Sequence, residues 1–224
     1  MPAVIVGGPG PTGSLPYVAS DDAGGMQRIV GHLVTLGPRR IDRVAGLPDF
    51  VSTQVRTQAF EEALTASGAS GRVFTTDFSS SAGAGATRHL LASPPRPTAI
   101  VYDNDIMAVA GLGVAQEMGV VVPVELSVVS YDDSPICEAV RPSLTACTRD
   151  VVAYGARAAR ALIALVEGKP VVPHLERPPR LVPRTSTCAP PAEAGRQGLR
   201  HFVTARVSKA RERLTKLDVA NAPS

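Results

Sequence analysis

The hydrophobic positions between residues 16 and 171 alternate between short apolar, often β-branched runs and longer stretches with apolar residues three and four apart. The short runs predict buried strands, and the wider spacing predicts amphipathic helices. Strands are expected at 17–20, 41–45, 73–75, 99–102 and 126–131, and helices at 21–36, 53–66, 82–91, 103–118 and 151–166, with extended segments following to residue 184. Regular alternation of this kind is typical of an α/β fold with a doubly wound parallel sheet.

The sequence also predicts the N-terminal cap of one helix and the inward-facing residues of two others. Asp21 or Asp22 precedes the apolar positions of helix 21–36 and is expected to cap its N-terminus. The spacing directs these residues inward: Val55, Ala59, Ala63 and Leu64 in helix 53–66, and Ile106, Ala110 and Val114 in helix 103–118.

Chemically distinctive residues follow three of the predicted strands at the point where each strand ends. They are Asp77 and Phe78, then Asp103, Asn104 and Asp105, and then Asp132 and Asp133. In open α/β sheets, ligands bind at the carboxyl ends of the strands. Short acceptors and amides at that edge can hold a hydroxyl-rich small molecule. The alternative is purely structural, because Asp and Asn at these positions also cap helices.

Several motifs occur in a fixed order over about residues 16–188. The first are Val18-Ala19-Ser20-Asp21-Asp22-Ala23-Gly24-Gly25, His32-Leu33-x-x-Leu36-Gly37-x-Arg39-Arg40-Ile41 and Arg56-x-x-x-Phe60-x-x-Ala63-Leu64. The next are Pro97-Thr98-Ala99-Ile100, Asn104-Asp105-x-Met107-Ala108 and a segment from Val122-Pro123 to Asp132-Asp133. The last are Pro142-x-Leu144-Thr145, Glu167-Gly168 and Arg180-Leu181-Val182-x-Arg184-x-Ser186-Thr187. Together they resemble the effector-binding domain of the LacI/GalR family of bacterial transcriptional regulators, although Ala59 stands where that family usually has Gly.

This resemblance implies a two-lobed, periplasmic-binding-protein-like type I fold. Residues 1–37 are then expected to be a partial N-terminal lobe and residues 38–147 the C-terminal lobe. Residues 148–188 return to the N-terminal lobe, and residues 189–224 are a linker and basic C-terminal helix or tail. The resemblance also implies a homodimer and a small-molecule effector, either a carbohydrate or a nucleoside- or purine-like compound, with no cofactor.

Four residues are the candidate ligand-binding set on the same resemblance. Arg56 would lie at the mouth of the cleft between the lobes, where its planar guanidinium can donate paired hydrogen bonds to vicinal hydroxyls. Phe78 falls where an aromatic ring lies against the ligand. Asn104 offers a donor and an acceptor, and Asp132 offers acceptors only.

Each candidate also has a structural interpretation. Arg56 can be a surface arginine of its helix, and Phe78 can fill the core. Asp105 is expected to cap its helix rather than contact a ligand. A carboxylate at Asp132, after an apolar strand, would be costly to bury without a partner, which Arg56 or a bound hydroxyl could supply.

The first residues of the chain are unlike the start of a complete family member. Only about fifteen residues precede the strand at 17–20, and they include four Gly and four Pro, a composition that does not form a helix-turn-helix. The N-terminal lobe is therefore expected to be incomplete and the DNA-binding headpiece missing. The strand at 17–20 and the helices at 21–36 and 151–166 are expected to carry uncovered apolar faces. Specific binding to operator DNA is expected only if a headpiece is restored.

Other functional classes lack support in the sequence. We find no nucleophile with a neighbouring base, no phosphate-binding glycine loop after a strand and no His or Cys spacing typical of a metal site, so no enzyme activity and no metal are expected. Cys137, Cys147 and Cys188 are expected to be reduced structural thiols. The chain has no apolar run long enough to cross a bilayer and no recognisable signal peptide, so it is expected to be cytoplasmic with no membrane partner.

The basic charge of the chain is concentrated in its tail. Residues 190–224 contain seven Lys and Arg against three acidic residues, whereas residues 1–189 contain 16 basic and 17 acidic residues. The tail carries a short heptad pattern at Val203, Val207, Ala210, Leu214 and Leu217. Residues 199–217 are therefore a candidate helix for tetramer formation, with a solvated amphipathic tail or a nonspecific phosphate-binding arm as alternatives.

The favoured function is sensing of a sugar or related small metabolite by a LacI-type regulator domain. A periplasmic-type solute-binding protein of the same fold is the first alternative, although the Arg184-x-Ser186-Thr187 ending is unusual for that class. A regulator remnant that binds nothing is the second alternative.

Overall fold

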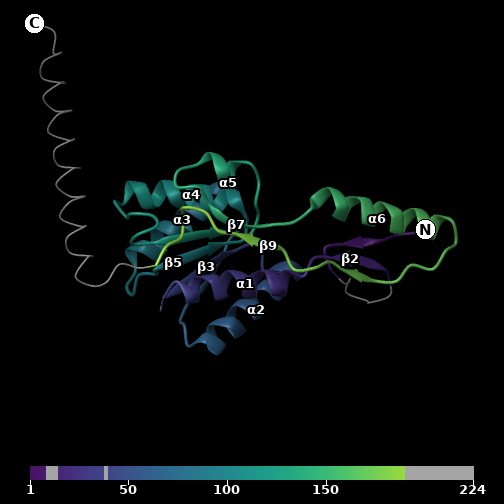
Figure 1. The fold of residues 1–224 in the computed structure, drawn as a ribbon, viewed down its shortest axis with the longest axis horizontal. Coiled ribbons are helices and arrows are strands. Elements are labelled where there is room, and N and C mark those ends of the chain that lie inside the picture. The colour runs from purple at the N-terminus through teal and green to yellow at the C-terminus, as the bar shows by residue number, and fades with distance from the viewer. Residues whose placement is uncertain (9–14, 38–39, 190–224) are drawn as a thin grey trace, which may run out of the picture. The chain divides into compact units, whose positions relative to one another are not determined.

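The computed structural model describes residues 1–8, 15–37 and 40–189, which form two separate sheets (Figure 1). The larger sheet has six strands in the order β4-β3-β5-β6-β7-β9. Its strands are β3 (Ile41–Ala45), β4 (Val73–Thr75), β5 (Ala99–Tyr102), β6 (Ser127–Ser130), β7 (Thr145–Thr148) and β9 (Arg180–Val182). All neighbouring pairs are parallel except β7 with β9.

Helices cover both faces of the six-stranded sheet. Helices α1 (Asp22–Thr35) and α2 (Val51–Ser67) pack on one face, and α3 (Ser80–Ala92) and α4 (Asp105–Glu117) pack on the other (Figure 1). Every residue of β5 and β6 is buried between these two layers, as parallel strands covered on both faces require. The predicted doubly wound α/β fold is therefore confirmed.

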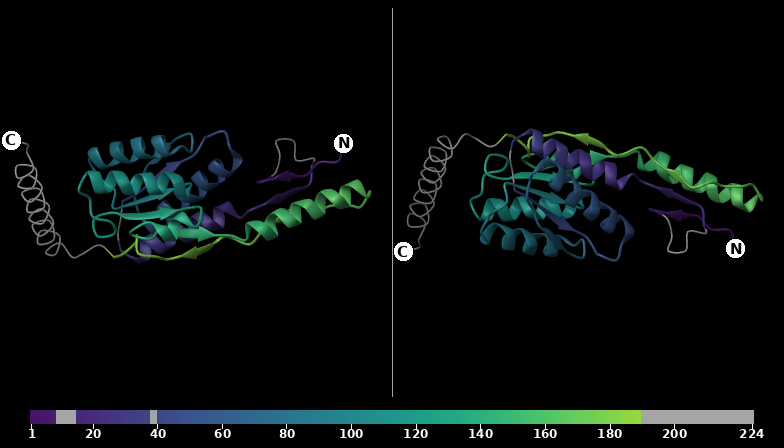
Figure 2. Two further views of the ribbon diagram at one scale, coloured as in Figure 1. Left: turned by 90° about the horizontal axis from the view of Figure 1, so that it is seen from above. Right: turned by 90° about the horizontal axis from the view of Figure 1, so that it is seen from below.

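The smaller sheet consists of three parallel strands with one long helix beside them. The strands are β1 (Ile5–Val6), β2 (Tyr17–Ala19) and β8 (His174–Leu175), in the order β1-β2-β8. Helix α6 (Val151–Val166) runs alongside them (Figure 2). It is attached by a hydrogen bond of 2.8 Å from the Tyr154 hydroxyl to the carbonyl of Val18 and by an ion pair of 2.6 Å between Arg157 and Glu176.

The uncovered apolar face predicted for helix 151–166 is present. No residue of α6 is buried, and Val152 and Val166 are 78% and 68% exposed. The same prediction is wrong for the strand at 17–20, where Val18 and Ala19 are buried, and for helix 21–36. Met26, Ile29 and Leu33 of α1 are fully buried, because they pack against α2 and the six-stranded sheet. Packing therefore places α1 with the larger sheet and not with the strands at the N-terminus.

Two predicted inward side chains point outward instead. Val55 in α2 is 37% exposed and Ile106 in α4 is 53% exposed. In each helix the adjacent residue, Arg56 or Met107, is buried instead. The other large residues predicted to point inward, Leu64 in α2 and Val114 in α4, are buried as expected. Strand β7 and the short helix α5 (Ile136–Ala139) were not predicted. Strand β9 extends the larger sheet, so residues 148–188 do not all return to the smaller one.

Two further points concern the tail and the length of the helices. The tail helix predicted at residues 199–217 lies outside the described residues. Among residues 1–8, 15–37 and 40–189, no helix is both long and apolar enough to span a membrane.

Candidate functional site

The candidate site lies at the carboxyl edge of the six-stranded sheet, where the connection from β3 leads to β4 on one side and β5 lies on the other. A parallel sheet opens a crevice at such a switch point because the connections diverge there. Gly46 and Asp103 follow β3 and β5, and the Gly46 amide donates a 3.1 Å hydrogen bond to the Asp103 carboxylate. The two strand ends are thereby joined.

Asp103 is held by a fully buried arginine. Arg43 donates to it from Nε at 2.8 Å and from Nη2 at 2.7 Å, and both side chains have zero exposure. Arg43 also donates to the hydroxyl of Thr57 at 2.7 Å. A buried carboxylate is stable only when paired and hydrogen-bonded in this manner. The Asp103 side chain therefore has a structural role, and only its backbone carbonyl takes part in the site, as an acceptor for Arg56.

Arg56 is not a surface arginine, because it is only 7% exposed. Its guanidinium donates to the Asp22 carboxylate at 3.2 Å and to the Asp103 carbonyl at 3.3 Å. The guanidinium carbon lies 3.6 Å from the centre of the Tyr131 ring, a cation–π contact. The Nε atom is buried and has no hydrogen-bond partner among the described residues. One donor of this arginine is therefore unused.

The charges around Arg56 keep it protonated. Burial alone would lower the pKa of Arg56, but the nearby charges of Asp22 and Asp103 outweigh burial and raise it. The Tyr131 hydroxyl donates to Asp22 at 2.9 Å. Burial first, and the Asp22 charge second, raise the pKa of Tyr131, so it stays a neutral donor. Asp22, Arg56 and Tyr131 thus form one buried group.

Phe78 and Asn104 are in direct contact. Phe78 has a left-handed backbone with φ of +67°, and its ring stacks on Phe50 with the ring centres 5.9 Å apart. The Asn104 amide donates to the Phe78 carbonyl at 3.0 Å, and its oxygen accepts from the Met107 amide at 2.8 Å. Asn104 is therefore the N-cap of α4. The prediction that Asp105 caps this helix is wrong, because Asp105 is already inside its first turn.

Asp105 has a different role from a cap. It is largely buried at 9% exposure, yet its carboxylate makes no hydrogen bond or ion pair to any described residue. Its oxygens are not sealed off, since they are absent from the buried and unpartnered atoms of the described residues. Asp105 is therefore an acceptor that a ligand could use.

Asp132 and Asp133, which follow β6, have different ion-pair partners. Asp133 receives two hydrogen bonds from Arg184, at 2.8 and 3.0 Å, so it is a structural anchor. Asp132 pairs with Arg149 at 2.9 Å and keeps 38% of its side chain exposed. The partner is thus Arg149 and not Arg56. Burial raises the pKa of Asp132 even though Arg149 and Arg56 oppose that effect.

The structure links the four predicted residues, although not all by direct contact. Phe78 touches Asn104, and Arg56 touches the residue before Asn104. Asp132 is near enough to Arg56 for its charge to act on that guanidinium. Sequence reasoning did not identify the partners Asp22, Tyr131 and Arg149. Their only sequence signal was their position beside a strand end or a crossing segment.

Other chemistry is not organised in the described part of the chain. Among those residues no group of three or more His, Cys, Asp and Glu could hold a metal ion. The Cys137 and Cys147 thiols are buried, and burial raises their pKa values to about 11 and about 12. Both thiols are therefore unreactive at neutral pH.

Residues 30–187 match the periplasmic binding protein-like domain family. The chain belongs to this family, in its LacI/GalR branch. Its curated relatives include the HTH-type transcriptional regulators reg1 of Streptomyces lividans, 32% identical, and MalR of Streptomyces coelicolor, 34% identical. Each alignment covers 88% of this chain and 59% of the relative. GalR of Escherichia coli is 32% identical over 79% of this chain and 53% of GalR. The chain thus spans less than two thirds of the length of these relatives.

Solved structures of the LacI/GalR family have the same fold. A LacI family transcriptional regulator from Bifidobacterium animalis subsp. lactis superposes with a TM-score of 0.81 at 39% identity, covering 85% of this chain and 70% of that one. A dimeric Lac repressor with an 11-residue C-terminal deletion gives a TM-score of 0.76 at 28% identity, over 85% and 70% of the two chains. The predicted two-lobed, periplasmic-binding-protein-like fold is confirmed.

Proposed function

We propose that this effector-binding domain senses a small hydroxylated metabolite, a sugar or a related compound, at the carboxyl edge of its six-stranded sheet. The observation that carries the proposal is the position of Arg56. Three parts of the fold meet at its guanidinium: the crossing segment at Asp22, the end of β5 at Asp103 and the end of β6 at Tyr131. The proposal is for a sensor and not an enzyme, and the curated relatives are regulators by name.

The groups left available suit an uncharged polyol. The carboxylates of Asp105 and Asp132 are acceptors that a ligand can reach. The Nε of Arg56 is a further donor, but it is buried, so a ligand reaches it only when the packing around it opens. The half-buried ring of Phe78 offers an apolar face for the C–H surface of a sugar or for a nucleobase. The positive charge of Arg56 is already balanced by Asp22, so an anionic ligand gains little from it.

Asp22 links the site to the segment that connects the two sheets. It begins α1 directly after the segment that joins β2 to the larger sheet. A ligand that competes for Arg56 would weaken the Asp22 contact and change the energy of that connection. Coupling of this kind needs a ligand that binds two arrangements of the chain with different free energies.

The remaining proposals concern self-association, operator DNA and location in the cell. We propose that the chain forms a homodimer, which the exposed apolar face of α6 and the likeness to a dimeric Lac repressor support. Operator binding is proposed only for a chain that carries a helix-turn-helix headpiece. A cytoplasmic location is the one consistent with a regulator of this kind.

The proposal is tested by a thermal-shift screen of sugars, nucleosides and purines, followed by calorimetry on each hit. Asp132→Asn is expected to weaken a hit at least tenfold, because it removes a partly exposed carboxylate from the site. Asp77→Asn is the matched control, since Asp77 also follows a strand but bonds only within its own loop. Equal affinities for the two variants would refute the assignment. A screen without any saturable hit would favour the interpretation as a remnant.

A further inference from the structure

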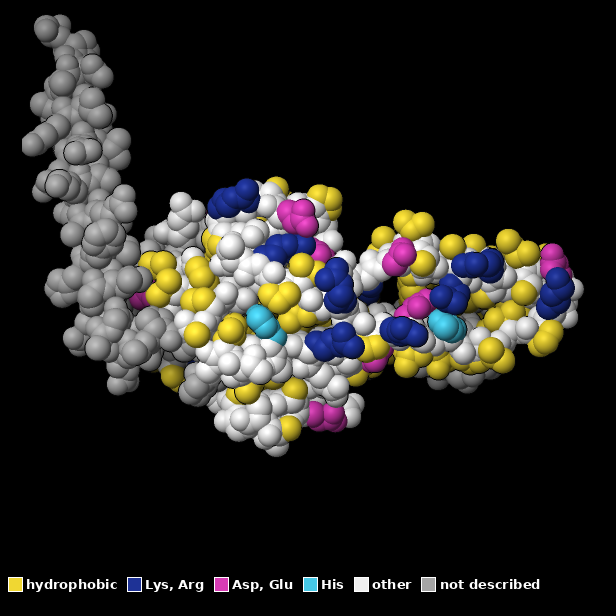
Figure 3. All heavy atoms as spheres, in the orientation of Figure 1, with side chains coloured by type: hydrophobic (Ala, Val, Ile, Leu, Met, Phe, Trp, Pro, Cys, Tyr) yellow, Lys and Arg dark blue, Asp and Glu magenta, His cyan; other side chains and the backbone are white. Residues whose placement is uncertain are grey.

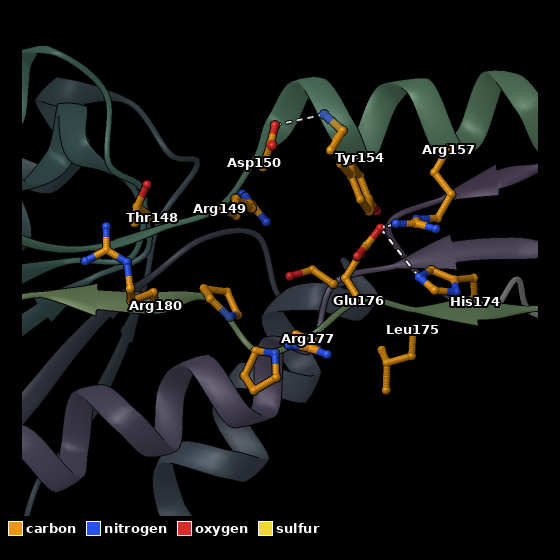
Figure 4. Close-up of a pocket in the computed structure, with 14 residues that line it drawn as sticks. Thr148, Arg149, Asp150, Tyr154, Arg157, His174, Leu175, Glu176, Arg177 and Arg180 are labelled. Atoms are coloured by element: carbon orange, nitrogen blue, oxygen red, sulfur yellow. Dashed lines mark hydrogen bonds and ion pairs between the residues drawn. The ribbon is translucent and has the colours of Figure 1, made fainter.

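A cavity of about 800 Å³ lies beside the segments that connect the two sheets (Figure 4). All three connections line it. Ser20 follows β2, Arg149 and Asp150 lie between β7 and α6, and Arg177 follows β8. A molecule bound there would touch every segment that joins the smaller sheet to the larger one.

The cavity is rich in arginine. Four guanidinium groups line it, from Arg149, Arg157, Arg177 and Arg180, against the carboxylates of Asp150 and Glu176. Figure 3 shows Lys and Arg side chains gathered around a hollow on this face. The lining therefore carries an excess of positive charge.

Most of the charged side chains that line the cavity already have an ion-pair or hydrogen-bond partner. Arg157 pairs with Glu176 at 2.6 Å, and Arg149 pairs with Asp132 at 2.9 Å outside the cavity lining. Asp150 accepts from the amide of Ala153 at 2.8 Å as the N-cap of α6. These contacts leave Asp150 as the one carboxylate of the lining that has no ion pair with a described residue.

Arg177 and Arg180 are the exceptions. Neither side chain forms a hydrogen bond or ion pair with any described residue. Arg180 begins β9 of the larger sheet, and Arg177 lies in the connection before it. Figure 4 shows Arg149 and Arg177 beside the opening and Arg180 at the far edge of the cavity, next to Thr148. Two guanidinium groups without partners in one concavity are a site for an anion with several oxygens.

We propose that this cavity binds a phosphate monoester through Arg177 and Arg180. The phosphate oxygens accept from the two guanidinium groups, and the organic part rests on Tyr154, Leu175 and Pro178, which line the same cavity. The strand-end site is unsuited to this ligand, because its guanidinium at Arg56 is held by Asp22. The two sites therefore bind different ligands: a polyol at the strand ends and a phosphate at the connecting segments.

The two sites share one connection, at Arg149. This residue lines the phosphate cavity while its guanidinium holds Asp132 of the strand-end site. A phosphate that draws Arg149 toward the cavity weakens the hold on Asp132. Phosphate binding is then expected to change the affinity of the strand-end site, and the effect is reciprocal.

The test is calorimetry at pH 7.5 with inorganic phosphate and with phenyl phosphate, at constant ionic strength balanced with sodium chloride. We expect saturable 1:1 binding, tighter for phenyl phosphate. Arg177→Gln and Arg180→Gln should each weaken phenyl phosphate at least fivefold, and the double variant should abolish binding. Arg177→Lys keeps the positive charge but loses the planar pair of donors, so its affinity should lie between those of wild type and Arg177→Gln.

The matched control is Arg160→Gln. Arg160 is an exposed arginine of α6 outside the cavity, and its side chain donates only to the Ala156 carbonyl. Absence of saturable binding, or an equal loss in Arg160→Gln, would overturn the proposal. The result does not depend on any sugar, so failure here leaves the strand-end proposal standing, and the reverse also holds. Circular dichroism verifies that each variant is folded.

Discussion

Replacing Arg56 by Met tests whether the buried group around Asp22 holds the crossing segment to the larger sheet. Met keeps an unbranched, apolar side chain that can still lie against Tyr131, but it removes the guanidinium. The Asp22 side chain, 6% exposed in its pair with Arg56, then keeps only the hydrogen bond from the Tyr131 hydroxyl among the described residues. A nearly buried carboxylate loses its counter-charge.

The expected cost follows from the environment of the pair. Removing one partner of a buried ion pair costs about 3–5 kcal/mol. The hydrogen bond from Tyr131 remains and reduces this figure, whereas the lost bond to the Asp103 carbonyl adds about 1 kcal/mol. We therefore expect Arg56→Met to lower the free energy of unfolding by about 3 kcal/mol, or about 6–12 °C in Tm.

A double-mutant cycle distinguishes the loss of this ion pair from a general loss of stability. Asp22→Asn removes the unpaired charge, so the double variant should be more stable than Arg56→Met alone by about 1–2 kcal/mol. Urea unfolding followed by circular dichroism measures all four proteins. If Arg56→Met costs less than about 1 kcal/mol, or if the two substitutions are additive, the buried charge pair does not have the role assigned to it.

Three further outcomes are expected. Gly46→Ala should cost about 1–3 kcal/mol in urea unfolding, because its Cβ would lie 1.7 Å from an aromatic ring carbon, whereas Gly113→Ala in open space within α4 should gain about 0.5–1 kcal/mol. The folded chain raises the pKa of Asp132 above its ordinary value of 3.8, so ionised Asp132 opposes folding. Wild type should lose stability relative to Asp132→Asn as pH rises from about 4 through the folded pKa, in a pH series of unfolding free energies. Val152→Glu with Val166→Glu, on the exposed face of α6, should weaken self-association at least tenfold by sedimentation velocity, and an unchanged association constant would exclude this face from the dimer.

The order of strands and helices was predictable because burial in this fold follows periodicity. Strands β3, β4 and β5 have the predicted bounds, and so does α6. The inward faces of α2 and α4 were harder, because each mixes small, polar and large residues. Arg56 shares the buried face of α2 with Ala59 and Leu64. Hydrophobic spacing could not predict a buried arginine and put Val55 inward in its place.

The candidate site was only partly predictable for a different reason. Strand ends mark where ligand-binding residues gather, which brought Phe78, Asn104 and Asp132 into consideration. Arg56 lies inside a helix and was predicted from the resemblance to the LacI/GalR family alone. Partner choice depends on distances across the fold that no local pattern encodes. Arg56 pairs with Asp22 at a separation of 34 residues, and Asp132 pairs with Arg149. The packing of α1 on the larger sheet, which brings Asp22 to the site, was itself not predicted.

The most direct measurement of the central claim is the Nε–H resonance of Arg56 in ¹⁵N-arginine-labelled protein during titration with a hit from the metabolite screen. This group is buried and unpartnered in the described structure, so a bound hydroxyl that accepts from it must move its signal. We predict a saturable shift with the same dissociation constant as calorimetry, and no comparable shift at Arg88, an exposed arginine paired with Glu117. A stationary Arg56 signal at saturating ligand would show that the metabolite binds elsewhere.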